Sequence, residues 1–473
     1  MTLSTDGPLL RDSEGRQRIL HGINLVDKGR LGSTDPTDFR GSWTEEDLAS
    51  LVEIGLDSVR LGVIWAAVEP EPGVYSEEHL GWVEEQLDRL NAQGLSVILD
   101  GHQDLYSQSH SDGAPPWATL TQHPFEATEL WSDAYLSSPA VQESYDAFWA
   151  DAPAADGTGI RTRFTALWGM LAQRFGGHPA VIGYDVLNEP TPGTAAADVF
   201  GAVIGTFAEA TGQDPQHVLA DFEQPERKLA QLAHLEDTEV HRRIGDAVAP
   251  LLAGFEQGPV RALYEQVLPA IRQHDPDGLI LREHDYFANI GIPAAIEPLP
   301  DCAWAYSPHG YDLVVDTEAM PLASDQRVET IFLRAAETAQ RLDVPVLVGE
   351  WGAFGSHQGI SRHADHQLEL FDRLGWSWFY WCWTEDFADT EAARRLRRPR
   401  PVAIAGDGAS WGTVDDSWRA AWQGAAGQAP SIFWIPEELD VELLVDGHPA
   451  DLARDGAVVR ISPTTGEHLL QVI

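Results

Sequence analysis

Residues 181–190 read VIGYDVLNEP, a short apolar run that ends in two polar residues and a proline. Val181 to Glu189 is typical of a buried parallel strand, and Pro190 ends it because proline has no backbone N–H for the strand ladder. Seven further runs of this kind alternate with helix-period segments: Arg18 to Leu25, Asp57 to Trp65, Leu95 to Gln103, Leu279 to Phe287, Ala303 to Tyr311, Val344 to Trp351 and Trp376 to Trp383. Eight such units predict an α/β fold, a closed (β/α)₈ TIM barrel.

The barrel is expected over residues 1–399, with helical insertions near 104–180 and 194–256 that interrupt the regular alternation. Loops at the carboxyl ends of barrel strands build active sites, so both insertions are candidates for pocket walls. Extra helical packing on the barrel flank explains them as well. Beyond residue 400, short alternating segments such as VELLVDG and AVVRISP predict a small C-terminal β-sandwich over residues 400–473.

Composition narrows the class of function. The 473 residues carry a formal charge of −43, which argues against nucleic acid and anionic membrane surfaces as partners because both would be repelled. No apolar stretch reaches the roughly 18 residues of a membrane span, so no stable membrane insertion is expected. The N-terminus lacks the basic start and apolar core of a signal peptide, which leaves a cytoplasmic protein or a secreted one with its leader removed. The cysteines and histidines lack metal-site spacing, so we expect no metal and no other cofactor; the oligomeric state is left open.

Two glutamates close predicted strands at the end where a TIM barrel has its active site. Glu189 ends the fourth strand and Glu350 the seventh, on opposite sides of the barrel mouth. Cleaving a glycosidic bond with retention needs a protonated carboxyl and a carboxylate ~5 Å apart. We expect Arg60, on the second strand, to hold Glu350 ionised as the nucleophile. Glu189 then keeps its proton as the general acid and later acts as the base.

Several motifs resemble glycoside hydrolase family 5 and, within it, the endoglycoceramidase-type branch. They are LHGINLVDK (20–28), DSVRLGVIWAAVEPEPGVY (57–75), LDGHQDLYSQ (99–108), GAPPWA (113–118), YDVLNEP (184–190), SPHGYD (307–312), VGEWGAFG (348–355) and the tryptophan-rich eighth strand. DGHQD together with GAPPWA is more specific to the branch than Asn-Glu-Pro alone.

The resemblance implies a role for each matching residue, with Glu189 as acid/base and Glu350 as nucleophile. The supporting residues that it implies are Asn188 at the sugar 2-hydroxyl, Arg60 and Tyr311 beside the nucleophile, His309 beside the acid/base, Lys28, His102 and Asp104 at the sugar hydroxyls, and Trp381 (alternatively Trp383) under the ring.

The implied substrate is a small-molecule β-glycoside or glycolipid, such as a glycosylceramide, cut between a glucose- or galactose-type sugar and an apolar aglycone. Trp117, Trp131 or Trp149 would line the aglycone groove, although core packing explains these residues equally well. Three alternatives stay open: an exo-acting β-glucosidase or glucosylceramidase, a polysaccharide endoglucanase, and a non-catalytic sugar-binding barrel. The chain departs from the branch in the long insertion 194–256 and in LREHDYF, where a Glu-Pro pair is expected.

Overall fold

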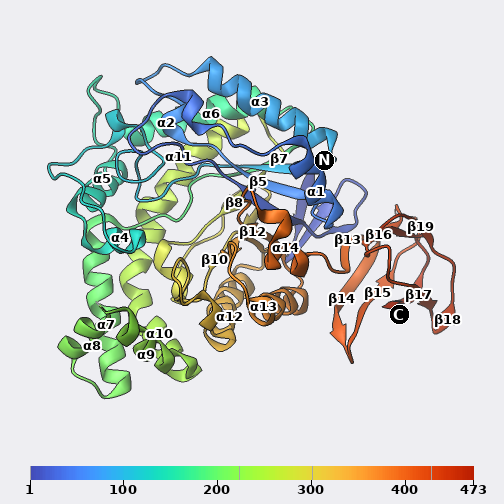
Figure 1. Cartoon of the computed structure of the whole chain (residues 1–473). Coiled ribbons are helices and arrows are strands. Elements are labelled where there is room, and N and C mark those ends of the chain that lie inside the picture. Colours follow the sequence, from blue (N-terminus) through green and yellow to red (C-terminus); the bar gives the residue numbers. More distant parts are fainter. Residues whose placement is uncertain (1, 223, 301, 428) are drawn as a thin grey trace.

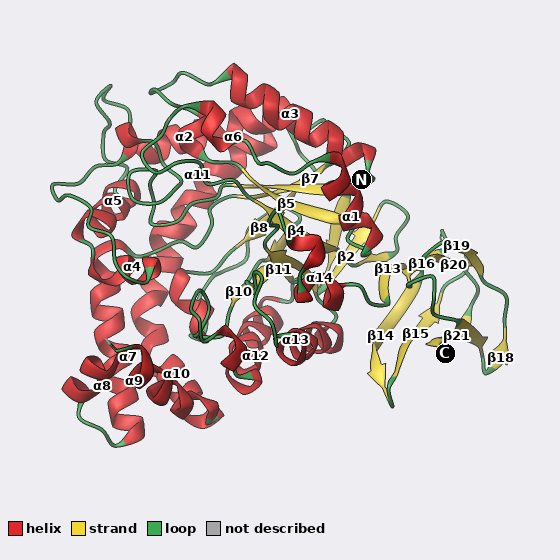
Figure 2. Cartoon of the chain, in the orientation of Figure 1, coloured by secondary structure: helices red, strands yellow, loops and turns green. Residues whose placement is uncertain are grey.

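A closed barrel of parallel strands forms the body of the chain (Figures 1 and 2). The computed structural model describes residues 2–222, 224–300, 302–427 and 429–473. In this part of the chain one sheet runs in the order β10-β11-β12-β4-β5-β6-β7-β8-β9, with parallel pairing throughout. The ring closes where the backbone N–H of Tyr306 donates to the carbonyl of Pro345 at 3.0 Å, beside a parallel bridge to Val346. The predicted TIM barrel is confirmed.

Each barrel strand overlaps its predicted run and is shorter than it. The strands are β4 (His21–Leu25), β5 (Ser58–Gly62), β6 (Ser96–Asp100), β7 (Val181–Asp185), β8 (Leu279–Arg282), β9 (Trp304–Tyr306), β10 (His309–Gly310), β11 (Leu347–Gly352) and β12 (Ser377–Trp381). β9 and β10 divide the sixth run between them. The polar residues that close most runs therefore lie just past the strands, at the barrel mouth.

Amphipathic helices surround the barrel (Figure 2). They are α1 (Glu45–Glu53), α3 (Glu77–Ala92), α6 (Ile160–Phe175), α11 (Arg261–Arg272), α12 (Asp325–Leu342), α13 (Ser361–Leu374) and α14 (Glu391–Leu396), with the short α2 (Trp65–Val68) before α3. Thr44 and Asp47 form a capping box that starts α1, and Ser76 caps α3. In the described chain, β8 is followed only by the short 3₁₀ helix η7 (Tyr286–Ile290) before β9. None of the described helices is both long and apolar enough to cross a membrane.

Both insertions are helical. The first contains η2 (Pro116–Ala118), η3 (Trp131–Asp133), α4 (Ala134–Ser137) and α5 (Pro139–Trp149), and the second contains α7 (Ala196–Thr211), α8 (Pro215–Phe222), α9 (Pro225–Leu232) and α10 (Thr238–Phe255). Figure 1 shows α7 to α10 as a projection at the lower left. Val199 of α7 and Leu252 of α10 share a buried cluster with Phe287 of η7. The second insertion thus packs on the segment that follows β8.

Two antiparallel sheets form the C-terminal β domain. Its strands are β13 (Arg400–Ile404), β14 (Gly406–Val414), β15 (Ser417–Gly424), β16 (Ser431–Trp434), β17 (Val441–Val445), β18 (His448–Pro449), β19 (Ala453–Asp455), β20 (Val458–Ile461) and β21 (Gly466–Val472). One sheet has the order β14-β15-β21-β17-β18, and β13, β16, β20 and β19 belong to the other. Trp418, Trp422, Phe433 and Leu470 share a core, as expected for a sandwich.

The N-terminal strands belong to a sheet of the C-terminal β domain. β1 (Leu3–Asp6), β2 (Leu9–Asp12) and β3 (Gln17–Arg18) extend the second sheet of the β domain, where Arg18 pairs with Ala403. The expected first strand therefore splits, and only the part from His21 onward enters the barrel. Local alternation identifies a strand but carries no information about a partner nearly four hundred residues away. The boundary at residue 400 remains a prediction.

Candidate active site

Arg60 is fully buried on β5 and joins four carboxyl groups at the barrel mouth. Its Nη2 lies 2.8 Å from Asp100 Oδ1 and 2.9 Å from Glu283 Oε1, its Nε 3.0 Å from Asp185 Oδ2, and its Nη1 2.8 Å from Glu350 Oε1. Buried carboxylates are costly unless they are paired. One guanidinium therefore holds four acids in place, three on barrel strands and one, Glu283, just past β8.

Glu350 on β11 is held at both oxygens. Arg60 donates to Oε1, and the hydroxyl of Tyr311 donates to Oε2 at 2.6 Å. Burial and the nearby Glu189 raise the pKa of Glu350 to about 7, although His309, Arg60 and the hydroxyl of Tyr311 each lower it. Arg60 thus favours the ionised form of Glu350, as predicted, while burial acts more strongly in the opposite direction.

Glu189 lies just past β7 and is 7% exposed. Its Oε1 accepts a hydrogen bond from Asn289 Nδ2 at 2.6 Å and lies 3.0 Å from His309 Nδ1. Its backbone N–H donates to Glu283 Oε2 at 2.7 Å. The backbone of Glu189 is left-handed, with a φ of 44°, which non-glycine residues seldom adopt. Such an outlier persists only where surrounding contacts hold it.

Glu189, Glu350 and His309 lie close together. One oxygen of each glutamate and one ring nitrogen of His309 all lie within 4.8 Å of one another. Burial disfavours a charged imidazole, but Glu283 and Glu350 outweigh it and raise the pKa of His309 well above its usual value. Carboxyl groups this close match a double displacement with retention, whereas inverting enzymes need roughly 6.5–9.5 Å for a water molecule.

Polar groups and an aromatic ring line a wall beside the two glutamates. Lys28 pairs with Asp104, and its Nζ lies 5.0 Å from the centre of the Trp381 ring. The ring of His102 stacks on Trp381 with centroids 5.1 Å apart, and its Nδ1 lies 2.9 Å from Asp100 Oδ2. His102 Nε2 is buried without a hydrogen-bond partner among the described residues. The wall combines charged donors and acceptors with an aromatic face, as sugar recognition requires.

The two candidate tryptophans of the eighth strand lie in different places. Trp381 pairs with Gly352, two residues after Glu350, and so stands at the mouth. Trp383 packs edge-on against Trp43, with ring centroids 5.6 Å apart. Of the two, Trp381 shares the wall described above.

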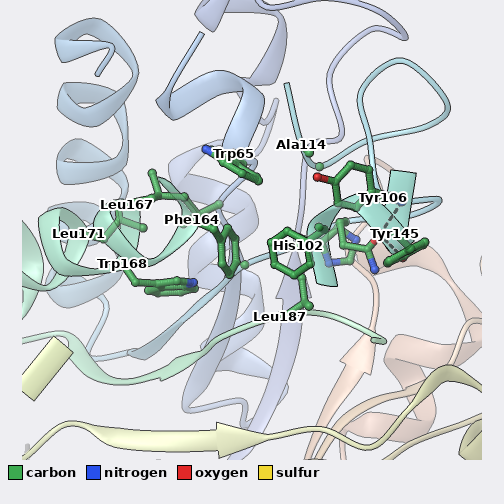
Figure 3. Close-up of a pocket in the computed structure, with 15 residues that line it drawn as sticks. Trp65, His102, Tyr106, Ala114, Tyr145, Phe164, Leu167, Trp168, Leu171 and Leu187 are labelled. Carbon is green, nitrogen blue, oxygen red and sulfur yellow. Dashed lines mark hydrogen bonds between the residues drawn. The ribbon is translucent and has the colours of Figure 1, made fainter. Parts of the chain in front are cut away.

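Gln103 and Asn188 fix the segment that carries the acid/base candidate. Gln103 Nε2 donates to the carbonyl of Asn188 at 2.6 Å, and Asn188 Nδ2 donates back to the carbonyl of Gln103 at 3.0 Å. The hydroxyl of Tyr145 donates to Gln103 Oε1 at 2.7 Å. Behind this pair lies a cavity of about 20 Å³ lined by aromatic residues such as Trp65 and Phe164 (Figure 3). It has room for one water molecule but none for a sugar, so we interpret it as a packing gap.

Only one of the three tryptophans proposed for the aglycone groove reaches the mouth. Trp131 is 36% exposed, donates to Asp316 Oδ2 at 2.9 Å, and has its ring 5.8 Å from Lys28 Nζ. Trp149 is buried and donates to a backbone carbonyl. Trp117 is half-buried and bonds another carbonyl. For these two the core-packing interpretation holds.

Two of the residues that contact Glu189, namely Glu283 and Asn289, were absent from the predicted site. Glu283 follows β8 and contacts Arg60 and the backbone of Glu189. Its place at a strand end was a usable signal. Asn289 donates to Glu189 from η7, whose position depends on the packing of the second insertion, and no sequence pattern marks it.

The family comparison decides the class of the protein. The family described as cellulase, glycosyl hydrolase family 5, matches residues 33–387. The chain belongs to glycosyl hydrolase family 5. It is therefore a glycoside hydrolase, and the family recognised from the motifs is confirmed.

Relatives place the chain within the family. Endoglycoceramidase I of Rhodococcus hoagii is 26% identical over 427 residues, which cover 86% of this chain and 73% of that protein. The solved structure of endo-glycoceramidase II from Rhodococcus sp., in a complex with a five-membered iminocyclitol, is 26% identical with a TM-score of 0.74 and covers 99% of both chains. A glucosylceramidase of Rhizopus delemar is 26% identical over 245 residues, 41% of this chain and 36% of that protein. The resemblance to the endoglycoceramidase branch is confirmed.

Proposed function

We propose that the chain hydrolyses, with retention, the β-linkage between a glucose- or galactose-type sugar and the apolar aglycone of a glycolipid. Glu350 is the nucleophile and Glu189 the acid/base. The observation that carries the proposal is the approach of the two side chains, with one oxygen of each within 4.8 Å of the other and of His309. The lipid aglycone is supported by the endoglycoceramidase relatives.

In the first step Glu350 Oε2 or Oε1 attacks the anomeric carbon while the bond to the aglycone oxygen breaks. Glu189 gives its proton to that oxygen, so the aglycone leaves as a neutral alcohol. Arg60 and the hydroxyl of Tyr311 stabilise the carboxylate form of Glu350, which is the form that attacks.

In the second step the deprotonated Glu189 takes a proton from water. The oxygen of that water attacks the anomeric carbon, and the bond to Glu350 breaks. His309 stays beside Glu189 Oε1 and Glu350 Oε2, at 3.0 and 3.6 Å, in a position to balance their changing charges. Asn289 donates to Glu189 and so holds the carboxyl toward the reacting oxygen.

Sugar recognition is assigned to the wall of Lys28, His102, Asp104 and Trp381. The unpartnered Nε2 of His102 is a free hydrogen-bonding group among the described residues, and a sugar hydroxyl is a natural partner for it. Trp381 offers a flat apolar face for the carbohydrate ring. Asn188 is assigned to the 2-hydroxyl, with its Oδ1 already bound by Arg60 at 2.9 Å.

A second candidate is exo-acting cleavage of a monosaccharide glycone, as in a glucosylceramidase. The observation that favours it is the hydrogen bond from Trp131 to Asp316, which joins two loops near Lys28. Such a bridge would suit a site that holds a single sugar. Turnover of a p-nitrophenyl β-glucoside and of the matching lactoside separates the two functions. A lactoside-only enzyme excludes the exo function, and hydrolysis of glycosylceramides beside inactivity on soluble glucans supports the lipid aglycone.

A further inference from the structure

Glu283 is a third glutamate in the site and is completely buried. Its Oε2 accepts the backbone N–H of Glu189 at 2.7 Å. Its Oε1 lies 2.9 Å from Arg60 Nη2 and 3.3 Å from His309 Nε2. The first partner is Glu189 itself. The other two, Arg60 and His309, contact Glu350 and Glu189 respectively.

The hydrogen bond to Glu189 acts on a strained residue. The φ of 44° at Glu189 is unfavourable for a residue with a Cβ, so the conformation needs contacts that maintain it. A hydrogen bond from a backbone N–H to a carboxylate is short and strong compared with a neutral one. Glu283 supplies such a bond directly at the strained residue.

The second oxygen of Glu283 acts on the ring of His309. Nε2 of this ring faces Glu283, and Nδ1 lies 3.0 Å from Glu189 Oε1. Among the groups that raise the pKa of His309, Glu283 has the largest effect. One carboxyl group therefore contacts both the backbone of the acid/base candidate and the ring that contacts its side chain.

We propose that Glu283 is a positioning residue for acid/base catalysis, which holds Glu189 and His309 in the geometry for proton transfer to the leaving group. The inference rests on the roles proposed above for Glu189 and Glu350. The competing explanation is that Glu283 only balances the charge of Arg60.

Asp185 provides a matched control for that explanation. It is as buried as Glu283 and lies 3.0 Å from Arg60 Nε. Among the described residues, its carboxylate makes no hydrogen bond to the backbone of Glu189, and its Oδ1 has no partner. Its carboxylate also lies within 4.8 Å of Glu283 and His309. Asp185→Asn therefore removes a buried charge from the same cluster while it leaves the hydrogen bond between Glu283 and the Glu189 backbone in place.

The test compares Glu283→Gln with Asp185→Asn on two glycosides of one sugar, with an alkyl and a dinitrophenyl leaving group. A glutamine has a single acceptor oxygen. It can therefore accept from the backbone N–H of Glu189 or from Arg60 and His309, but not from both sides. We expect kcat of Glu283→Gln to fall by roughly 100-fold on the alkyl glycoside and by less than about tenfold on the dinitrophenyl glycoside. The reason is that only the poor alkyl leaving group needs a proton from Glu189. KM should change little. Asp185→Asn should lose similar activity on both substrates.

Equal losses of Glu283→Gln on both substrates, or no loss, would overturn the inference. If this variant does not fold, as judged by its thermal unfolding midpoint, Glu283→Asp is measured instead. Its shorter carboxylate still reaches one partner but not all three, and the same dependence on leaving group is expected. Glu350→Gln is assayed alongside: if it stays active the proposed function fails, whereas a dead Glu350→Gln with equal losses at residue 283 removes only the inference.

Discussion

Replacing Tyr311 by phenylalanine should move the acid limb of the pH–rate profile to higher pH. The hydroxyl of Tyr311 donates to Glu350 Oε2 at 2.6 Å and lowers the pKa of this carboxyl. A hydrogen bond to a charged group contributes about 1.5–3 kcal/mol, and 1.36 kcal/mol corresponds to one pKa unit. Glu350 is 4% exposed, so water compensates little for the loss. The pKa should rise from about 7 to roughly 8–9.

The direction follows from the chemistry of the nucleophile. As the proposed nucleophile, Glu350 must be ionised to attack. Its pKa in the folded protein is raised from 4.5 to about 7, so we expect activity to be lost as pH falls through 7. The measurement is kcat/KM for an activated aryl β-glycoside from pH 5 to 10, which reports the free enzyme. At pH 6 the variant should lose at least about tenfold more than at its plateau. An acid limb that stays in place, with a uniformly lower plateau, would refute the reasoning and leave Tyr311 a role in the transition state only.

Three further outcomes follow from the site. Glu350→Gln should abolish hydrolysis of every glycoside while the thermal unfolding midpoint stays or rises, because the change removes a buried ionisable group. Glu189→Ala should retain partial activity on dinitrophenyl glycosides and almost none on alkyl glycosides; equal losses on both would contradict its role as the acid. Gln103→Ala should lower the free energy of unfolding by roughly 2–4 kcal/mol in urea, because it leaves the carbonyl of Asn188 and the hydroxyl of Tyr145 without a partner. An unchanged urea midpoint would show that Gln103 does not hold this segment.

The barrel and the meeting of its polar strand ends could be predicted because both follow from short-range patterns. Val181 to Asp185 is a buried strand by its composition, and barrel closure brings the residues after every strand to one mouth. For that reason the main site residues come together: Glu189, Glu350, Arg60, His309 and the wall at Lys28.

The remaining features depend on contacts between distant segments. β3 joins the C-terminal domain through Ala403, a choice of partner that alternation does not encode. Asn289 reaches Glu189 because α7 and α10 support η7. The pKa of Glu350 depends first on its burial and then on the charges of His309, Arg60 and Glu189, all of which are set by packing across the barrel.

The covalent intermediate gives the most direct test of the account. The enzyme is incubated with a 2-deoxy-2-fluoro β-glycoside that carries an activated leaving group, which slows the second step, and the digested protein is analysed by mass spectrometry. The account predicts one sugar per chain, attached to the peptide that contains Glu350. Turnover without any bound sugar, or attachment to another side chain, would contradict it.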